Sequence, residues 1–306
     1  MTTDKLHIKR LAILGVGLIG GSLARALRRA GVCETIVGYG RNEDNLRTAQ
    51  ALGVIDSYAM QPAAVVRDAD MIVLATPLST TARLLQQMQT AIIPTATLTD
   101  VGSAKGSVVK ACTDTLTPEQ LRRFVPGHPI AGTEKSGVEA SFAELYEDHL
   151  AILTPLPQQD AGHLQRVTRM WEATGARVVT MTIEHHDQIL AATSHLPHML
   201  AYALVDCLAG MQTRDEIFRY AAGGFTDFTR IASSNPRMWA DICMANRDNL
   251  ISVLELFDTH IRDIKHAIAS GNGDALLAIF SRAKNSRDEF IRNKLENGKR
   301  KVESSE

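Results

Sequence analysis

The apolar positions of the chain change their spacing near residue 183. Before that point, short apolar runs alternate with segments whose apolar residues recur every three or four positions. This alternation is typical of βαβ units, which build a parallel sheet. The apolar runs predict strands at Leu11–Leu14, Thr35–Tyr39, Met71–Ala75, Thr97–Asp100, Leu150–Thr154 and Arg177–Thr180.

Helices are expected between most of these strands, and two of them end at a glycine. Gly31 follows a predicted helix at Gly20–Ala30, and Gly53 follows one at Asn42–Leu52, in the position that favours left-handed backbone. After Ile183 only the helical spacing continues. The helices predicted there are Glu184–Thr193, Met199–Ala209, Arg214–Ala222, Pro236–Ala267 and Asp274–Leu295.

This division predicts an α/β protein of two domains. Residues 1–183 are expected to form a doubly wound sheet, and residues 184–306 an all-helical domain. The 306 residues, with 45% hydrophobic and 22% charged, are enough for two cores of ordinary globular composition. The segment Ile189–Gly210 is apolar, but His195, Pro197, His198 and Asp206 make it a buried helix rather than a membrane span.

Charge and cysteine content exclude several classes of function. The formal net charge of −1 creates no field that would attract nucleic acid or an anionic membrane, so neither is an expected partner. The four cysteines are far apart with no Cys-x-x-Cys pair, which argues against a disulfide framework and a structural zinc site. Since the N-terminus also lacks the apolar stretch of a signal peptide, we expect a cytoplasmic protein.

A glycine-rich turn, Gly15-Val16-Gly17-Leu18-Ile19-Gly20, follows the first predicted strand and opens a helix. In a dinucleotide-binding turn the first glycine allows the tight turn, the second lets backbone approach a pyrophosphate, and the third permits close packing of helix on strand. The turn therefore predicts a Rossmann domain that binds a nicotinamide dinucleotide. The residues expected to contact the cofactor are Gly15, Gly17, Leu18, Ile19, Gly20, Gly40, Arg41, Thr76 and Pro77.

The end of the second strand bears on the choice between NAD and NADP. An acidic residue there would bind the free ribose hydroxyls of NAD, but this chain continues Tyr39-Gly40-Arg41-Asn42. Arg41 could pair with a 2′-phosphate, so we expect NADP to be preferred. NAD stays the alternative, because a single arginine in a loop can also be a solvated residue.

Further motifs surround the expected ligand edge of the sheet. Asp100-Val101-Gly102-Ser103-Ala104-Lys105 follows a strand, and Gly127-His128-Pro129 is expected on a loop. Together with Gly17–Ser22, Gly132-Thr133-Glu134, Thr193–His198, Gly223–Arg230 and Pro236–Trp239, these segments resemble the prephenate and arogenate dehydrogenases of tyrosine biosynthesis, from about Leu11 to Leu295. The resemblance implies a Rossmann domain followed by a helical dimerisation domain, and hence a homodimer.

The resemblance implies the oxidative decarboxylation of prephenate to 4-hydroxyphenylpyruvate, or of arogenate to tyrosine, with hydride transfer to the cofactor. His128 then matches the catalytic histidine, a suitable base near neutral pH, and Ser103 a serine that orients the same hydroxyl. Arg230 matches an arginine that binds a substrate carboxylate. The remaining matches place His198, Gly223 and Trp239 at the substrate, Trp239 from the partner subunit, and Glu134, His195 and Asp227 as residues that hold the others in position.

Other interpretations remain open at this stage. His195 and His198 could belong to a helix face, a core or a metal pair, but no carboxylate or cysteine at fitting spacing completes a site, so no metal is predicted. A 3-hydroxyacid-type dehydrogenase would place a lysine base in the helical half, and a dinucleotide-binding sensor would not turn over. Between the two substrates we expect prephenate, with dual use open.

Overall fold

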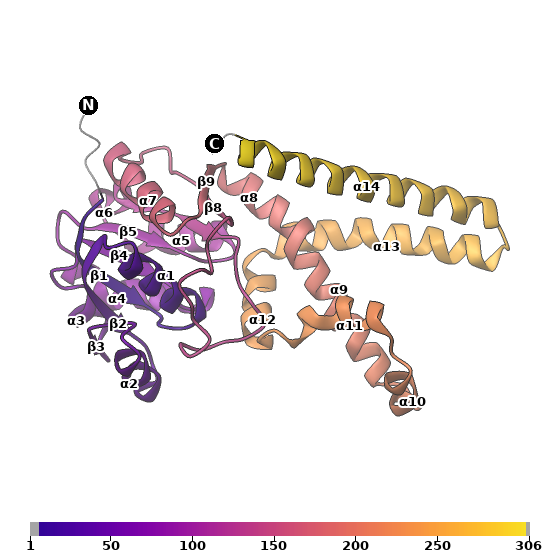
Figure 1. Ribbon diagram of the computed structural model, residues 1–306, viewed down its shortest axis with the longest axis horizontal. Coiled ribbons are helices and arrows are strands. Elements are labelled where there is room, and N and C mark those ends of the chain that lie inside the picture. The colour runs from indigo at the N-terminus through magenta and orange to yellow at the C-terminus, as the bar shows by residue number, and fades with distance from the viewer. Residues whose placement is uncertain (1–5, 304–306) are drawn as a thin grey trace. The chain divides into compact units, whose positions relative to one another are not determined.

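The computed structural model describes the backbone of residues 6–303 and the side chains of residues 6–293. The chain forms two compact units, one ending at Leu250 and one beginning at Ile251 (Figure 1). The change from strands to helices falls earlier, after β9 (Arg177–Thr180). The first unit therefore contains all the strands and the first group of C-terminal helices.

The first unit is built on a six-stranded parallel sheet with the strand order β3-β2-β1-β4-β5-β6. Its order reverses between β1 and β4, and ligands of such sheets bind beyond the carboxyl ends of the strands at that point. The predicted doubly wound fold is thus confirmed. The strands are β1 (Ile8–Leu14), β2 (Cys33–Tyr39), β3 (Ser57–Ala59), β4 (Met71–Leu74), β5 (Thr97–Asp100) and β6 (Phe124–Val125).

Helices cover both faces of this sheet because its strands are apolar on both sides. Within β1, Leu11 and Ile13 enter one buried cluster while Ala12 and Leu14 enter the other. The first cluster is completed by α1 (Leu18–Arg29), α2 (Glu43–Ala51) and α7 (Ala161–Ala173). The second is completed by α3 (Pro62–Val66), α4 (Thr81–Met88), α5 (Lys105–Thr115) and α6 (Pro118–Arg122).

A second sheet corrects two of our expectations. It has the order β7-β8-β9, in which β7 (Gly127–Pro129) runs antiparallel to β8 (Leu150–Leu153). The predicted strands at 150 and 177 thus belong to this sheet rather than to the first, and His128 lies on a strand rather than on a loop. A strand of three residues is too short to show alternation, and Pro129 is tolerated because β7 is at the edge of its sheet.

Helices follow β9 in the first unit. They are α8 (Ile183–Leu190), a π-helical turn at Ala191–His195, α9 (Leu196–Ala209), α10 (Arg214–Arg219), α11 (Gly223–Thr229), a 3-10 turn at Arg230–Ser233 and α12 (Pro236–Ala245). The single helix expected at Pro236–Ala267 is wrong, because Asn246 interrupts it. Its backbone leaves the helical region, and its side-chain amide donates a hydrogen bond to the carbonyl of Asp187.

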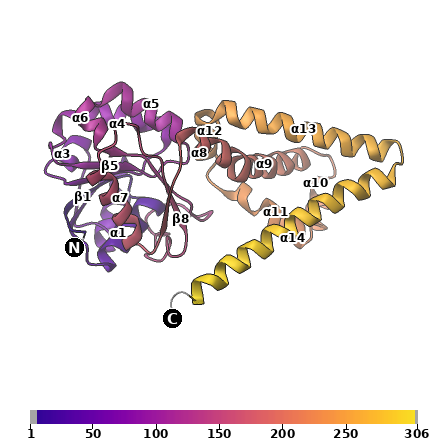
Figure 2. The ribbon, with the colours of Figure 1, turned by 90° about the horizontal axis from the view of Figure 1, so that it is seen from above.

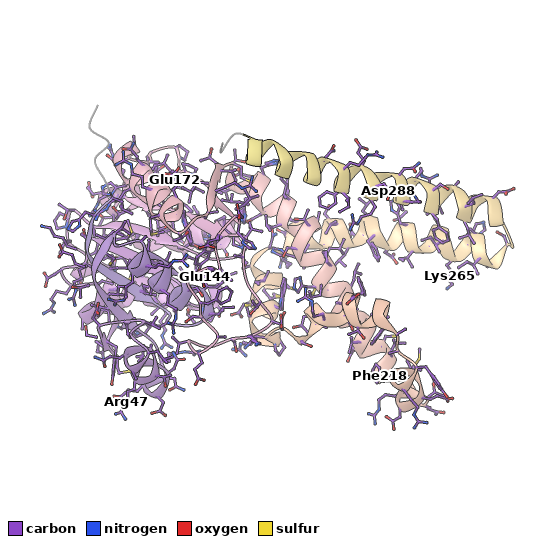
Figure 3. The ribbon with its side chains drawn as sticks, viewed as in Figure 1. Arg47, Glu144, Glu172, Phe218, Lys265 and Asp288 are labelled. Carbon is purple, nitrogen blue, oxygen red and sulfur yellow. The ribbon has the colours of Figure 1, made fainter. Side chains whose placement is uncertain are left out.

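The second unit consists of most of α13 (Arg247–Ala269) and of α14 (Gly273–Glu303). Gly271, with φ of +66°, makes the turn between them, and the two helices diverge from it (Figure 2). Side chains project along both helices (Figure 3). Large apolar side chains are exposed there, at Ile251, Leu256, Ile261, Ile268, Leu277, Phe280 and Phe290. Among the described residues, no helix has the length and apolar character that crossing a bilayer requires.

A buried ion pair connects the two sheets. Lys105, at the start of α5, pairs through Nζ with Asp100, at the end of β5, and both side chains are buried. Nζ also donates to the carbonyl of Gly127 at 2.6 Å, and the Gly127 amide donates to Asp100 at 3.1 Å. The pair therefore fixes the beginning of β7 against the end of β5.

We expect Lys105→Met to lower the free energy of unfolding by about 3–5 kcal/mol, because it leaves the Asp100 carboxylate buried and uncompensated. Urea unfolding followed by circular dichroism measures this loss. Lys110→Met is the control, since Lys110 forms an exposed ion pair with Asp114 on the same helix and should cost no more than about 1 kcal/mol. Equal losses in the two variants would contradict the role given to Lys105.

Candidate active site

The glycine turn between β1 and α1 has the geometry of a phosphate-binding cradle. Gly15 has φ of +110°, and a Cβ there would lie 2.3 Å from the carbonyl oxygen of Ala75. A Cβ on Gly20 would lie 2.2 Å from the Gly15 carbonyl oxygen, whereas one on Gly17 would meet nothing within 4 Å. No side chain caps the N-terminus of α1, so its first amides are open to an anion. A dinucleotide pyrophosphate fits this cradle.

The other residues expected at the cofactor near this turn lie at the same edge of the sheet. Leu18 is buried and Ile19 half-buried in the first turn of α1. Thr76 and Pro77 follow β4, the strand next to β1. Two residues further on, Ser79 donates a hydrogen bond of 2.5 Å to Asp241 of α12. The loop after β4 is thereby attached to the helical part of the first unit.

The loop after β2 carries an arginine that no carboxylate engages within the described contacts. Gly40 is half-buried, Arg41 is exposed, and Asn42 caps α2 by accepting from the amide of Asn45. The nearest carboxylate in sequence, Glu43, accepts from Arg47 at 3.1 Å and from the Tyr58 hydroxyl at 3.2 Å. The loop therefore presents a guanidinium rather than a free acid.

His128 lies at one end of a buried hydrogen-bonded series. Its Nδ1 lies 2.9 Å from Nε2 of His186, and Nδ1 of His186 lies 2.7 Å from Oδ1 of Asp187. Burial, followed by the nearby charges of His186, Lys105 and His195, lowers the pKa of His128 well below its usual value. His128 is therefore a neutral imidazole at neutral pH.

Asp187 is held by the N-terminus of α5. Its two carboxylate oxygens accept from the amides of Lys105 and Gly106, each at 2.8 Å. Burial tends to raise the pKa of Asp187, but the hydrogen bonds from His186 and from these two amides outweigh it, so the pKa is lowered. The carboxylate is thus ionised and takes the place of a cap that the residue before α5, Ala104, cannot supply.

His195 is a second buried, neutral imidazole. Its Nδ1 lies 3.2 Å from the side-chain amide of Asn246, and burial is the main cause that lowers its pKa to about 4. The backbone of Ser103 raises the pKa of the same imidazole. Ser103, half-buried between β5 and α5, is therefore a neighbour of His195. Nε2 of His195 has no hydrogen-bond partner among the described residues.

His198 and Trp239 form a stacked pair, with ring centroids 3.6 Å apart and planes 21° apart. His198 is held through Nδ1 by the carbonyl of Ser194 at 2.8 Å, and Trp239 is buried. Trp239, on α12, stacks on His198 of its own chain, and its role at the partner subunit's site stays a prediction. The stack therefore forms without a second copy.

Arg230 provides the guanidinium of the site. It begins the 3-10 turn after α11, is largely exposed, and pairs with Glu134 at 3.3 Å. Its charge contributes to the lowered pKa of His198, after burial, so the two side chains are near each other. Gly223 and Asp227 lie on the exposed surface of α11.

Pairs of neighbouring side chains connect His128 to Arg230. Electrostatic influence connects His128 to His195, His195 to His198, and His198 to Arg230. A neutral base and a cation thus lie in one region of the first unit.

Sequence reasoning missed His186, Asp187 and Asn246. The available signal was the pair of polar residues at 186 and 187, which lie on the buried face of the helix predicted at Glu184–Thr193. No cluster of three or more metal-ligating side chains occurs in the part of the chain that is described.

Comparisons with known proteins identify the family of the chain. The family model described as "Prephenate dehydrogenase, nucleotide-binding domain" matches residues 23–180. The one described as "Prephenate dehydrogenase, dimerization domain" matches residues 182–282. The first match begins after the glycine turn, so the cradle is supported by its own geometry.

Individual relatives are similar over most of their length. A cyclohexadienyl dehydrogenase of Zymomonas mobilis is 40% identical over 281 residues, covering 91% of this chain and 95% of the relative. The crystal structure of prephenate dehydrogenase from Aquifex aeolicus with hydroxyphenyl propionate and NAD+ has a TM-score of 0.86 and 38% identity, and covers 94% of this chain and 100% of that one. The chain therefore belongs to the prephenate dehydrogenase family.

Proposed function

We propose that this chain catalyses the oxidative decarboxylation of prephenate to 4-hydroxyphenylpyruvate, with hydride transfer to a nicotinamide dinucleotide. The observation that carries the proposal is the neutral, buried His128, connected through neighbouring imidazoles to the guanidinium of Arg230. The names of the relatives, and the NAD+ and hydroxyphenyl propionate bound to the Aquifex aeolicus enzyme, support the same reaction.

The residues of the chain supply a base, a second hydroxyl contact and a carboxylate clamp. Nε2 of His128 accepts the proton of the ring hydroxyl while Ser103 orients that hydroxyl. A bound nicotinamide would accept the hydride from the ring carbon that bears this hydroxyl. When carbon dioxide leaves, its bonding electrons make the ring aromatic, and His128 returns the proton to the phenolate oxygen. Arg230 binds a carboxylate of the substrate and holds the ring in place.

The substrate and the subunit arrangement extend this proposal. Prephenate is the preferred substrate, and arogenate, with an amino group in place of the keto group, can meet the same base. Residues 1–183 bind the dinucleotide, and residues 184–306 bind substrate and form a homodimer. The exposed apolar side chains of α13 and α14 support the dimer, since such a surface is normally covered. A cytoplasmic location and the absence of nucleic-acid partners remain predictions.

The other residues of the proposed site surround His128, Ser103 and Arg230. His198, Trp239 and Gly223 border the substrate, and Glu134, His195 and Asp227 hold the substrate-binding side chains. At the cofactor, Arg41 pairs with a 2′-phosphate, so NADP is preferred over NAD. This preference rests on the exposed guanidinium and on the engagement of Glu43 with Arg47 and Tyr58.

Replacing the base should affect turnover rather than binding. We expect His128→Asn to lower kcat by about 10²–10⁴-fold with little change in KM, because proton transfer matters only in the transition state. NADPH absorbance after addition of prephenate measures the rate. His149→Asn, at an exposed histidine before β8, is the control. A near-normal kcat in His128→Asn would overturn the assignment, and turnover of 3-hydroxy acids instead of prephenate would favour the other dehydrogenase class.

Removing Arg230, which binds the substrate carboxylate, should affect KM more than kcat. We expect Arg230→Ala to raise KM for prephenate by about 10–100-fold with a smaller effect on kcat, since a charged hydrogen bond of about 1.5–3 kcal/mol is lost in ground and transition states alike. Steady-state kinetics at saturating cofactor give both constants. Arg230→Lys, which keeps the charge but loses the fork, should fall between the two. An unchanged KM in Arg230→Ala would refute the clamp.

The cofactor preference has its own test. We expect the wild-type protein to have a higher kcat/KM for NADP than for NAD, and Arg41→Ala to lower the NADP value about tenfold while leaving the NAD value unchanged. Arg83→Ala, at an exposed arginine on α4, controls for the general loss of positive charge. A wild-type preference for NAD would show that Arg41 does not select the cofactor.

A further inference from the structure

We propose that His186 and Asp187 are positioning residues that present an unprotonated Nε2 of His128 to the substrate and stabilise the imidazolium that forms there. The inference rests on the proposed function, in which His128 is the base. Its support is the hydrogen-bonded series from His128 through His186 to Asp187, together with the burial of all three side chains.

The direction of each hydrogen bond follows from the chemistry of its two ends. An ionised carboxylate can only accept, so Nδ1 of His186 carries a proton and donates it to Asp187. In a neutral His186, Nε2 is then the acceptor, and Nδ1 of His128 must be the donor to it. A neutral His128 with a proton on Nδ1 has a free lone pair on Nε2. The series therefore selects the one tautomer that can remove a proton from the substrate.

The carboxylate at the end of the series is fixed independently of the histidines. Asp187 accepts from the Lys105 and Gly106 amides at the N-terminus of α5. The carbonyl of Asp187 also accepts from Asn246 at 2.7 Å. Both carboxylate oxygens and the carbonyl of this residue are therefore occupied, so its carboxylate cannot rotate away from His186 without leaving the amides of Lys105 and Gly106 unpaired.

The same series reduces the cost of charging a buried base. A proton taken up at Nε2 makes His128 cationic in a region without solvent, which is unfavourable unless an anion is near. The hydrogen bonds through His186 connect this cation to the ionised carboxylate of Asp187, which stabilises it while each proton stays on its own ring. The aspartate of a serine protease acts on one imidazole in a similar way. Here a second imidazole stands between.

A purely structural role for Asp187 is the alternative, because Asp187 caps α5. Asn and Asp cap helices about equally well, so Asp187→Asn keeps an acceptor for the helix amides but removes the negative charge. The matched control is Asp160→Asn, since Asp160 caps α7 by accepting from the amides of Gly162 and His163 at 2.8 and 3.2 Å and has no part in the series.

We expect Asp187→Asn to lower kcat for prephenate about 10–100-fold with KM and the Kd for cofactor unchanged, while Asp160→Asn keeps the wild-type kcat. The acid limb of the kcat/KM profile should move to lower pH in Asp187→Asn, because the charge that favours protonated His128 is gone. The other titratable groups near His128, which are His186, Lys105 and His195, are unchanged. A wild-type kcat and acid limb in Asp187→Asn would overturn the proposal.

A measurement without substrate separates this inference from the proposed function. Long-range ¹H–¹⁵N spectra of histidine-labelled wild-type protein report which ring nitrogen carries the proton, with signals assigned by their loss in His128→Asn and His186→Asn. We expect protonated Nδ1 and bare Nε2 on both residues. A protonated Nε2 on neutral His128 would overturn the proposal even in an active enzyme. If the protein does not oxidise prephenate, the proposed function fails while the tautomers still decide whether the series exists.

Discussion

The position of Lys105 is the constraint on which the site depends. Its side chain binds Asp100 and the Gly127 carbonyl, and its backbone amide binds the carboxylate of Asp187. One residue at the start of α5 thus holds the strand that carries His128 on one side and the helix that carries His186 on the other. A lysine without solvent contact is rarely tolerated unless it is paired, and here the pairing also sets the distance between two imidazoles.

The first unit combines two different kinds of rigidity. The cofactor cradle depends on sterics, because the backbone of Gly15 and Gly20 approaches neighbouring backbone more closely than any side chain allows. The proton-transfer region depends on electrostatics, because burial keeps His128 and His195 uncharged while Asp187 stays ionised. Arg230, in contrast, is exposed and pairs with Glu134 at the surface, so a carboxylate ligand can compete for it. The arrangement is thus rigid at the glycine turn and around the buried imidazoles, and open at Arg230.

The sequence predicted those features that depend on local spacing. The strand at Thr97–Asp100 and the left-handed glycines at 31 and 53 are confirmed residue for residue, because turn geometry and period-two or buried runs leave direct signals. The separate sheet was not predicted, since the pairing of β7 with β8 joins segments separated by a long connection. The helix break at Asn246 was missed because the apolar spacing continues through it, whereas the break depends on contacts of Asn246 with distant residues, Asp187 and His195. Individual site residues could be named from the resemblance, but the link from His128 to Asp187 spans distant elements.

The π-helical turn at Ala191–His195 has a geometric consequence for this region. His186 and His195 are nine positions apart, and in a continuous α-helix, at about 100° per residue, they would point to opposite sides. The wider turn holds an additional residue per loop of backbone and rotates the following helix back, so that both imidazoles reach the neighbourhood of Asn246 and Asp187. The number of residues in this segment therefore sets the direction in which the side chains of the following helix point. Loss of a single amino acid would turn the whole of α9, with His198, out of phase with the helix before it, whatever the identity of the remaining side chains.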